Sequence, residues 1–429
     1  MQGRGAERGR RRVRGILLAL LAVTAAAAAA EDDARVLRVG TSGDYRPFSH
    51  RDAGGLPAGF DVALARAFAT ASGRELVLVP FPWPKLLDQL AAGRFDLAAS
   101  GVTVRPERSA AGAFSVPLVE TNALALARNP QRWRGRASLD RPAIGIAVNA
   151  GGHLERVARA SFPHAGLIAI PDNEAVLGLL LEDRVHAVVT DDVEAPHWEA
   201  RVDEPLARIG PLSRDRKAWL VAPDRPDLSA ELDAWLLARE ADGTLAALRA
   251  EWLGEARAVT ADPLRALLAA LDERLAMMPL VGVVKRRDGV PIAVPEREEY
   301  VIDRALADVG AAAERAGLEP PPDVAVRALF RASIDAAKHV QMEAVRGDDD
   351  APDALPDLDT ALRPGLIRIG ARIARLLVAL PADLDADVVR DAAREQLRAT
   401  HLEDRHRDAL AAAIAACSKR EAKRASSPE

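Results

Sequence analysis

Cysteine is almost absent from this sequence, because Cys417 is the only one in 429 residues. A single thiol forms no disulfide within the chain, so a fold that depends on internal disulfides for its stability is excluded. The fold must therefore be held by an apolar core, and 49% of the residues are hydrophobic. That content and this length indicate a globular protein of two or three domains.

A strong basic field is also missing from the body of the chain. The formal net charge is −5, and residues 1–30 contribute +5 through six arginines and one glutamate, which leaves −10 for the remainder. Nucleic-acid binding depends on lysines and arginines that displace phosphate counterions. The acidic balance therefore argues against nucleic acid as a partner.

The apolar run at the start is shorter than a membrane span. Residues 16–30 form a run of 15, whereas a spanning helix needs about 20. An arginine-rich segment precedes this run, and a string of alanines ends it before Glu31. These are the parts of a secretory signal, so we expect residues 1–30 to be cleaved and no stable membrane insertion to follow. The arginine pairs leave general secretion and twin-arginine export both open.

From residue 36 to about residue 253, short β-rich runs alternate with amphipathic helices. Strands are predicted for "VLRVGTS", "ELVLVPF" and "FDLAAS", with the helices "GFDVALARAFATASG" and "WPKLLDQLAAG" between them. A second set has strands "AIGIAVN", "GLIAIP" and "VHAVVT", with helices after Gly152 and over "NEAVLGLLLED". This rhythm predicts two α/β lobes with mostly parallel sheets. In such sheets the ligand lies at the carboxyl ends of the strands, here between the lobes.

The character of the chain changes after "EWLGEARAVTADP". Residues 262–429 are rich in Ala, Leu, Arg and Glu, and "PLRALLAALDERLAMMPLVGVVKR" places leucines at the spacing of one long helix. We therefore predict an α/β unit over residues 35–255 and an all-α unit over residues 259–429. Further helices are predicted at about 297–316, 322–346, 359–379, 385–400 and 402–418.

Three segments of the α/β unit resemble the periplasmic solute-binding proteins that bind polar amino acids. These are "LRVGTSGDYRPFS", "GFDVALARAFA" and "FDLAASGVTVRPERSAAGAFSVPL". The resemblance implies a two-lobed binding-protein fold in which Arg108 binds a ligand carboxylate through two of its guanidinium nitrogens. Thr103 and the backbone of Ser100 and Gly101 would assist it. The alternative for Arg108 is a surface ion pair with Glu107.

A closer resemblance is to cyclohexadienyl dehydratases, enzymes built on the same fold. It is carried by "FPWPKLLDQLAAGRFDLAASG", "VNAGGHLERVARA", "PDNEAV" and "VVTDDVEA". In these enzymes T-D-x-x-E supplies a proton donor, which corresponds to Glu194. Prephenate becomes phenylpyruvate by losing CO₂ and its ring hydroxyl, and an acid must protonate that hydroxyl before it leaves. A carboxyl in a closed, partly apolar cleft has its pKa raised, which keeps the proton available near neutral pH.

The resemblance also implies an anion site on the second lobe. Asn149 and the backbone of Gly151 and Gly152, at a helix N-terminus, would hold an anionic group of the substrate. This chain has "GGHLE" where the dehydratases have "GGTNE". His153 is therefore either a substrate contact or a structural residue.

Four more residues complete the expected cleft. Tyr45 and Trp83 would wall the substrate ring, although Trp83 is equally interpretable as ordinary packing. Lys217 matches a basic position near the pocket. Asp191 corresponds to the acid at a strand end that binding proteins use for an amino group. Aromatisation drives the reaction, so we expect neither a metal nor an organic cofactor.

The all-α unit resembles the secreted, gamma class of chorismate mutases. The resemblance is carried by "LLAALDERLAMMPLVGVVK", "PIAVPEREEYVIDRA" and "FRASIDAAKHVQ" over residues 262–346, and more loosely by residues 359–418. Arg286 and Val294 stand where the family has an aromatic residue and an acid. Rearrangement of chorismate to prephenate needs two carboxylates held in place and charge stabilised on the breaking ether oxygen.

Spacing and resemblance together select the residues for that task. Arg274 and Lys285 are eleven positions apart, which is close to three helical turns, so their side chains lie on the same face of the helix. The distance between them along the helix axis is about 16 Å. The resemblance implies that Arg297 takes a carboxylate while Lys285 and Gln341 meet the ether oxygen. Arg372 is a weaker candidate for a second carboxylate contact. The alternative for the set is a stripe of surface charge.

The two resemblances describe consecutive reactions, from chorismate through prephenate to phenylpyruvate. We therefore expect an exported, periplasmic, bifunctional enzyme on the route to phenylalanine. One alternative is a solute-binding module fused to an active mutase, and Glu194 distinguishes the two. The other is a structural protein, supported only by the Ala-rich helices. Prephenate and arogenate both stay open as substrates of the first unit, and a homo-oligomer is compatible with the sequence.

Overall fold

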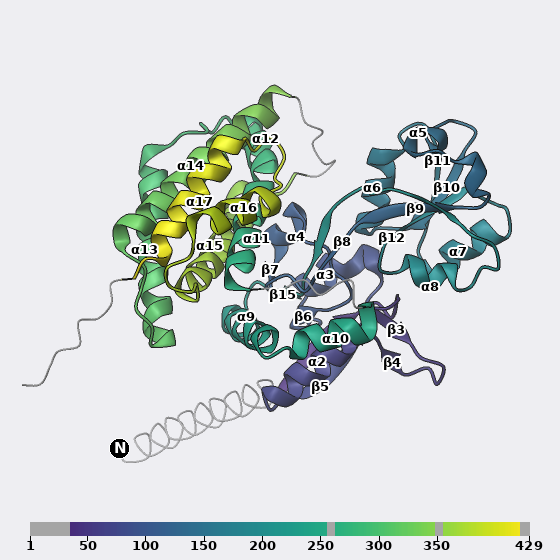
Figure 1. The fold of residues 1–429 in the computed structure, drawn as a ribbon, viewed down its shortest axis with the longest axis horizontal. Coiled ribbons are helices and arrows are strands. Elements are labelled where there is room, and N and C mark those ends of the chain that lie inside the picture. Colours follow the sequence, from purple (N-terminus) through teal and green to yellow (C-terminus); the bar gives the residue numbers. More distant parts are fainter. Residues whose placement is uncertain (1–34, 255–261, 348–354, 421–429) are drawn as a thin grey trace, which may run out of the picture.

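The computed structural model describes residues 35–254, 262–347 and 355–420. Two α/β lobes and a helical body are visible in Figure 1, with the first lobe between the other two parts. The expected signal peptide, residues 1–30, lies outside the described residues. Within the described ranges, no helix has the length and apolar character needed to cross a membrane.

The first lobe is built on a five-stranded sheet with the order β5-β1-β6-β15-β7. β1 pairs in parallel with β5 and β6, and β15 runs antiparallel to β6 and β7. Since β15 comes more than a hundred residues after β7, the chain leaves this lobe and later returns to it. The strands are β1 (Val36–Thr41), β5 (Glu75–Pro80), β6 (Leu97–Ala98), β7 (Ala113–Phe114) and β15 (Leu220–Val221). The helices are α2 (Phe60–Ala71), α3 (Leu86–Ala91), α4 (Pro106–Ala111), α9 (Pro226–Ala241) and α10 (Thr244–Leu253), with a small sheet of β2 (Asp44–Tyr45), β3 (Ser49–Arg51) and β4 (Pro57–Ala58).

The second lobe has a sheet of the order β11-β10-β12-β9-β13. β10 is parallel to β11 and β12, whereas β9 is antiparallel to β12 and β13. Two crossing strands, β8 (Val119–Thr121) and β14 (Asp215–Lys217), pair with each other and join the lobes. The prediction of two α/β lobes is thereby confirmed. The strands are β9 (Ala123–Ala127), β10 (Gly145–Asn149), β11 (Gly166–Ile170), β12 (Ala187–Asp191) and β13 (Ala207–Ile209), and the helices are α5 (Arg136–Leu139), α6 (His153–Ser161), α7 (Asn173–Leu181) and α8 (Ala195–Glu199).

The described residues from 262 onward form a helical body, as predicted. One detail of the prediction is wrong, because the expected long helix divides at Met277 into α11 and α12. Pro279 stands in the first turn of α12 and has no N–H to donate to the carbonyl of Leu275. The helices are α11 (Pro263–Ala276), α12 (Met278–Asp288), α13 (Pro295–Ala316), α14 (Asp323–Arg346), α15 (Arg363–Val378) with a π-helical turn before it (Leu358–Leu362), α16 (Ala386–Gln396) and α17 (Asp404–Ser418).

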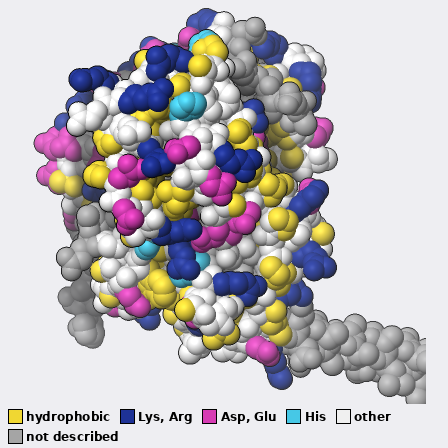
Figure 2. Space-filling model, turned by 90° about the vertical axis from the view of Figure 1, so that its right-hand side faces the viewer, with side chains coloured by type: hydrophobic (Ala, Val, Ile, Leu, Met, Phe, Trp, Pro, Cys, Tyr) yellow, Lys and Arg dark blue, Asp and Glu magenta, His cyan; other side chains and the backbone are white. Residues whose placement is uncertain are grey.

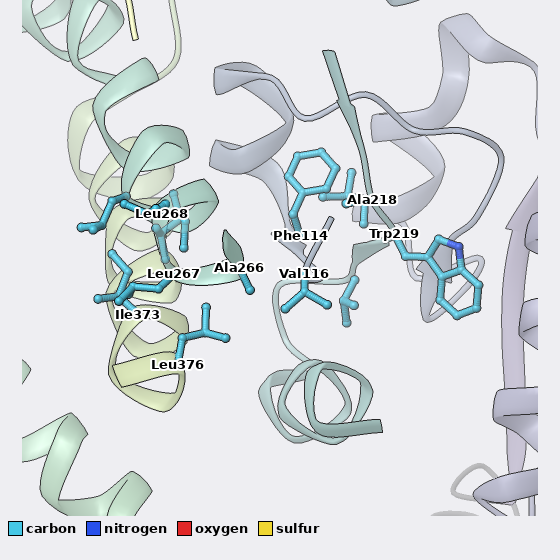
Figure 3. Close-up of a cluster of buried hydrophobic side chains, with 14 of the residues drawn as sticks. Phe114, Val116, Ala218, Trp219, Ala266, Leu267, Leu268, Ile373 and Leu376 are labelled. Carbon is cyan, nitrogen blue, oxygen red and sulfur yellow. The ribbon is translucent and has the colours of Figure 1, made fainter. Parts of the chain in front are cut away.

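The helical body and the first lobe share one continuous hydrophobic core. α11 and α15 pack against α4, and α15 also contacts β7. Figure 3 shows side chains of α11 and α15 in one cluster with side chains of the first lobe. The two units that the sequence separates are therefore packed as one body. The labelled residues are Ala266, Leu267, Leu268, Ile373 and Leu376 on the helical side, and Phe114, Val116, Ala218 and Trp219 on the other.

A buried ion pair between α11 and α15 lies at this junction and is hydrogen-bonded to the first lobe. The Glu273 carboxylate accepts a hydrogen bond from the Ser109 hydroxyl at 2.8 Å and forms a salt bridge with Arg372. The Arg372 guanidinium also donates to the main-chain carbonyls of Phe114 and Ser115. Ser109 follows Arg108, and Glu273 precedes Arg274, so the contact joins the neighbours of two residues expected in different sites.

Replacing Glu273 by alanine should destabilise the whole chain. The change leaves the guanidinium of Arg372, which is 4% exposed, without its carboxylate. Removing one partner of a buried pair costs about 3–5 kcal/mol of unfolding free energy. Urea and thermal unfolding would measure the loss. Glu299→Ala is the matched control, because Glu299 pairs with Arg331 on the surface and should matter little. Equal losses in both variants would contradict a special role for the buried pair.

Candidate active sites

A cavity of about 30 Å³ lies where the two lobes meet. The lobes close on each other around it, since Asn173 donates to the Asp44 carbonyl at 3.1 Å and Arg156 pairs with Glu107 at 2.6 Å. A space of this size holds about one water molecule. A ring-sized ligand therefore enters only when the lobes move apart. The lining residues are Tyr45, Trp83, Gly101, Thr103, Arg108, Asn149, Gly152, His153, Leu154, Asn173 and Lys217.

Arg108 lines this cavity from α4 and is only 2% exposed. Its guanidinium donates to the Thr103 carbonyl at 2.9 Å and lies 5.8 Å from the centre of the Trp83 ring. Among the described residues, no carboxylate lies within ion-pair distance of it. The alternative of a surface pair with Glu107 is wrong, because Glu107 pairs with Arg156 and Arg105 instead. Burial lowers the pKa of Arg108 well below its usual value, so an anionic ligand would relieve an uncompensated charge.

Aromatic rings form one wall of the cavity. The Tyr45 and Trp83 rings meet edge to face with centroids 6.1 Å apart, and Trp83 also packs on Phe81. Trp83 thus both packs and lines the cavity. Gly101 has φ +60°, and a Cβ there would lie 2.7 Å from the Tyr45 ring, so glycine is needed for this close approach. Ser100 does not line the cavity, because its hydroxyl accepts from the Ser42 N–H at 3.0 Å.

Lys217 and Asp191 meet beside the Tyr45 hydroxyl. The Lys217 ammonium lies 3.1 Å from that hydroxyl, 3.0 Å from the Thr103 hydroxyl and 3.4 Å from the Asp191 carboxylate. Tyr45 donates its hydroxyl proton to Asp191, and burial together with that carboxylate raises the pKa of Tyr45. Asp191 is fully buried and outside the cavity lining. In this closed arrangement it joins the lobes.

Glu194 stands at the N-cap position of α8 and is 1% exposed. Its carboxylate accepts from the Asn173 amide at 2.7 Å and from the Thr190 hydroxyl at 2.6 Å. Burial raises the pKa of Glu194 well above its usual range, although the Thr190 hydrogen bond opposes the shift. The expected direction of the shift is confirmed. Glu194 itself does not line the closed cavity, because Asn173 stands between them.

The second lobe presents Asn149, Gly152 and His153 to the cavity. The expected role of the Gly151 amide is not reproduced here, because that N–H donates to the Glu155 carboxylate at 2.7 Å. The Asn149 amide donates to the Pro171 carbonyl at 3.0 Å.

His153 contacts an acid outside the expected set. Its Nε2 lies 2.8 Å from the Asp215 carboxylate, while its Nδ1 is buried and has no hydrogen-bond partner among the described residues. Burial lowers the pKa of His153 in spite of Asp215, which favours the neutral imidazole. A neutral ring with an unused nitrogen at the cavity is able to bind a polar substrate atom.

A second cavity, of about 260 Å³, lies within the helical body. Four predicted residues line it together: Arg274 of α11, Lys285 of α12, Arg297 of α13 and Gln341 of α14. In the part of the chain that the structure describes, no carboxylate pairs with Arg274, Lys285 or Arg297. The alternative of a surface charge stripe is excluded by this convergence.

The cations of this cavity are partly or fully removed from water. Arg274 donates to the Leu366 carbonyl at 3.3 Å, and burial lowers its pKa to about 10, with a smaller effect from Arg297. Lys285 donates to the Ile292 carbonyl at 3.0 Å, and burial and the nearby Arg363 lower its pKa. Positive charges that lower each other's pKa are stabilised by bound carboxylates.

Gln341 is placed by a close contact of two helices. Gly282 of α12 faces Gln341, and a Cβ at position 282 would lie 2.9 Å from the main-chain carbonyl oxygen of Gln341. The Gln341 side-chain nitrogen donates to the Ala337 carbonyl at 3.2 Å, while its side-chain oxygen is buried without a partner among the described residues. The amide is thereby held at the wall of the cavity.

The assignment of Arg372 to this site is wrong. Arg372 lies on α15 outside the cavity lining and pairs with Glu273 at the junction with the first lobe. Sequence reasoning missed Arg363, which lines the cavity one turn into the helical segment that begins at residue 358. It also missed Asn173, although "PDNEAV" contains it immediately after the N-cap Asp172 of α7. Asn173 could have been found from the sequence, because it is a polar residue at the start of a predicted helix near the cleft.

Two protein families match different parts of this chain. Residues 37–255 match the bacterial extracellular solute-binding proteins, family 3, and residues 265–342 match chorismate mutase type II. The chain is 33% identical to the cyclohexadienyl dehydratase of Pseudomonas aeruginosa over 249 residues, which covers 55% of this chain and 92% of that protein. It is 26% identical to the L-cystine-binding protein TcyJ of Escherichia coli over 258 residues, which covers 58% and 97% of the two chains.

Among solved structures, the ancestral amino acid-binding protein AncCDT-1, a precursor of cyclohexadienyl dehydratase, is 28% identical. The superposition covers 51% of this chain and 96% of the ancestral protein, with a TM-score of 0.49. The two family matches divide where the fold changes from two α/β lobes to helices. This chain therefore belongs to family 3 of the bacterial extracellular solute-binding proteins and carries a chorismate mutase type II domain behind that region.

Proposed function

We propose that this chain is a bifunctional enzyme of aromatic amino-acid biosynthesis. The unit at residues 259–429 rearranges chorismate to prephenate, and the unit at residues 35–255 converts prephenate to phenylpyruvate. The observation that carries this proposal is the convergence of Arg274, Lys285 and Arg297 on one cavity without a carboxylate partner among the described residues. Such a site suits a dicarboxylate, and a cyclohexadienyl dehydratase is among the relatives of the other unit.

In the helical site the protein contributes position and charge. Arg274 and Arg297 bind the two carboxylates and hold the enolpyruvyl side chain over the ring. Lys285 and the Gln341 amide donate hydrogen bonds to the ether oxygen, where negative charge develops as the C–O bond breaks. No proton is transferred in this rearrangement, so no acid or base is required. Arg363 adds a positive field at the same wall.

In the cleft, Arg108 binds a substrate carboxylate and Glu194 protonates the departing ring hydroxyl. The C–O bond breaks to give water, the ring carboxylate leaves as CO₂, and its electron pair completes the aromatic ring. Opening of the lobes breaks the contact of Asn173 with Asp44, which lets substrate approach Glu194. Asn149, Gly152 and His153 contact the other end of the substrate, and Tyr45 and Trp83 flank its ring.

The expected location and partners follow from the same proposal. Residues 1–30 resemble a secretory signal, so we place the mature chain in the periplasm without stable membrane insertion. Figure 2 shows lysine and arginine side chains interspersed with aspartates and glutamates on the face it presents. A mixed surface of this kind suits small substrates better than nucleic acid. A homo-oligomer stays compatible with it.

Prephenate supplied alone separates an enzyme from a solute-binding module. A dehydratase forms phenylpyruvate and CO₂ with repeated turnover, whereas a binding module takes up one equivalent and releases it unchanged. The assay should run at neutral pH beside a blank without protein, because prephenate aromatises in acid. Tight binding of an amino acid together with no turnover of prephenate would favour the module and overturn the dehydratase proposal.

Replacing Arg108 by lysine should raise the KM for prephenate by roughly tenfold or more. Lysine keeps the charge but cannot form the two parallel hydrogen bonds of a guanidinium to a carboxylate. Steady-state assays of phenylpyruvate formation would measure the change, and mutase turnover in the same variant reports that the chain is folded. Arg132→Lys is the matched control, because Arg132 is exposed and stacks on Trp133. An unchanged KM would place the substrate away from Arg108.

A further inference from the structure

Three potential metal ligands gather on the helical body, outside the residues that line either cavity. His339 comes from α14, while Glu403 and His406 come from the start of α17. One ligand atom from each residue lies within 4.8 Å of the others. His339 Nε2 is 3.2 Å from the Glu403 carboxylate, and the two imidazole rings are 4.7 Å apart between centroids. The cluster thus spans two helices far apart in sequence.

The spacing of these atoms fits a small divalent cation. Zinc binds imidazole nitrogen and carboxylate oxygen at about 2.0–2.2 Å, which places neighbouring ligand atoms roughly 3–3.5 Å apart. Glu403 and His406 are three residues apart and lie at neighbouring positions on the first turn of α17. Small side-chain rotations therefore bring all three atoms to bonding distance. The His339 side chain is 13% exposed and that of Glu403 is 49% exposed, so the carboxylate side is open to solvent.

One nitrogen of the cluster has no hydrogen-bond partner among the described residues. This nitrogen is His406 Nδ1, which is buried. A metal binds an imidazole nitrogen that carries no proton, and this buried Nδ1 has no competing partner in the part of the chain that the structure describes. Asp335 lies one turn before His339 on α14 and adds negative charge near the cluster.

We propose that His339, Glu403 and His406 bind one divalent transition-metal cation of the zinc type. Two imidazoles and a carboxylate suit zinc and its neighbours better than magnesium or calcium, which prefer oxygen ligands alone. The cation fastens α17 to α14, and α14 carries Ala337, Lys338 and Gln341 into the lining of the helical cavity. The site is structural and takes no part in the rearrangement, because it lies outside the cavity lining.

Zinc titration of the full chain, without a histidine tag and after treatment with EDTA, tests this proposal. Calorimetry should find one equivalent bound, and thermal unfolding should shift to higher temperature with zinc and return with EDTA. His406→Ala and Glu403→Gln should weaken zinc binding by about 100-fold or more, since loss of even an outer-shell partner costs 10–100-fold. His197→Ala is the control, because His197 is exposed on α8 and should leave binding unchanged.

Two further measurements distinguish an effect of a variant on folding from an effect on metal binding. Unfolding temperatures in EDTA should be similar for wild type and Glu403→Gln, because this side chain is half exposed. Cobalt bound to the wild type should show the visible absorption of a low-symmetry site, and His339→Ala should lose it. Absence of zinc binding by the wild type, or equal affinity in all variants, would overturn the proposal. Binding that is lost in His197→Ala as well would point to unfolding and would also count against it.

Discussion

Lys285→Ala should lower the rate of prephenate formation from chorismate by roughly two to three orders of magnitude. The ammonium lies in the helical cavity, half removed from water, and its hydrogen bond to the Ile292 carbonyl leaves further donors for a ligand. Loss of one preorganised donor at a developing oxyanion commonly costs about 10²–10³ in kcat. Gln341→Ala should have an effect of the same kind, because its amide is held at the same wall.

Arg286→Ala is the matched control for Lys285. Arg286 is the next residue along α12, but its guanidinium donates to the Val345 carbonyl at 2.8 Å and lies outside the cavity lining. Initial rates of chorismate loss would be measured for each variant, with turnover of prephenate by the first unit as the indicator of folding. Near-normal rates in both Lys285→Ala and Gln341→Ala would contradict the assignment of the helical site.

Glu194→Gln should abolish phenylpyruvate formation and leave the mutase step largely intact. Glutamine keeps the size of the side chain and an oxygen that accepts from the Asn173 amide, but it has no proton to deliver to a departing hydroxyl. General acid catalysis contributes about 10²–10⁴-fold, so the loss should fall in that range or exceed it. Fed with chorismate, this variant should accumulate prephenate. Glu199→Gln is the control, because Glu199 pairs with Arg208 at the surface.

The pH dependence of the dehydratase step has a definite sign. Burial raises the pKa of Glu194 well above its usual range, so the acid form is present below that pKa and is lost above it. Turnover of prephenate should therefore fall as the pH rises through the pKa of the group in the complex. Rates of phenylpyruvate formation across pH, with the Glu194→Gln variant as reference, would measure this limb. Wild-type turnover that is constant across that range would contradict the acid role.

Family motifs together with local spacing were sufficient to find most of the residues in both sites. Arg274 and Lys285 were found from the resemblance to the mutases and from their helical spacing, and both line the cavity although the helix divides at Met277. The division alters the helical spacing of these two residues little, because the φ and ψ angles of Met277, −76° and −17°, stay close to those of an α-helix. Asn149 and His153 were found through the resemblance to the dehydratases, and both line the cavity between the lobes.

Contacts between distant segments were beyond the reach of those patterns. Arg372 was misassigned because helical spacing does not tell which neighbour a face of α15 meets, and here the neighbour is the first lobe. The Gly151 amide was expected to be free for an anion, but Glu155 in the first turn of α6 accepts from it. The first outcome depends on tertiary placement, which a sequence pattern does not contain. The second is a local contact over four residues, which the spacing of Gly151 and Glu155 could have indicated.

A time course with chorismate as the only substrate measures both proposed reactions in one experiment. The full chain would be incubated with chorismate at neutral pH, and chorismate, prephenate and phenylpyruvate would be separated and quantified beside a blank without protein. We expect prephenate to rise and then fall while phenylpyruvate approaches the amount of chorismate consumed. Prephenate that accumulates to that amount, with phenylpyruvate no higher than in the blank, would contradict a bifunctional enzyme.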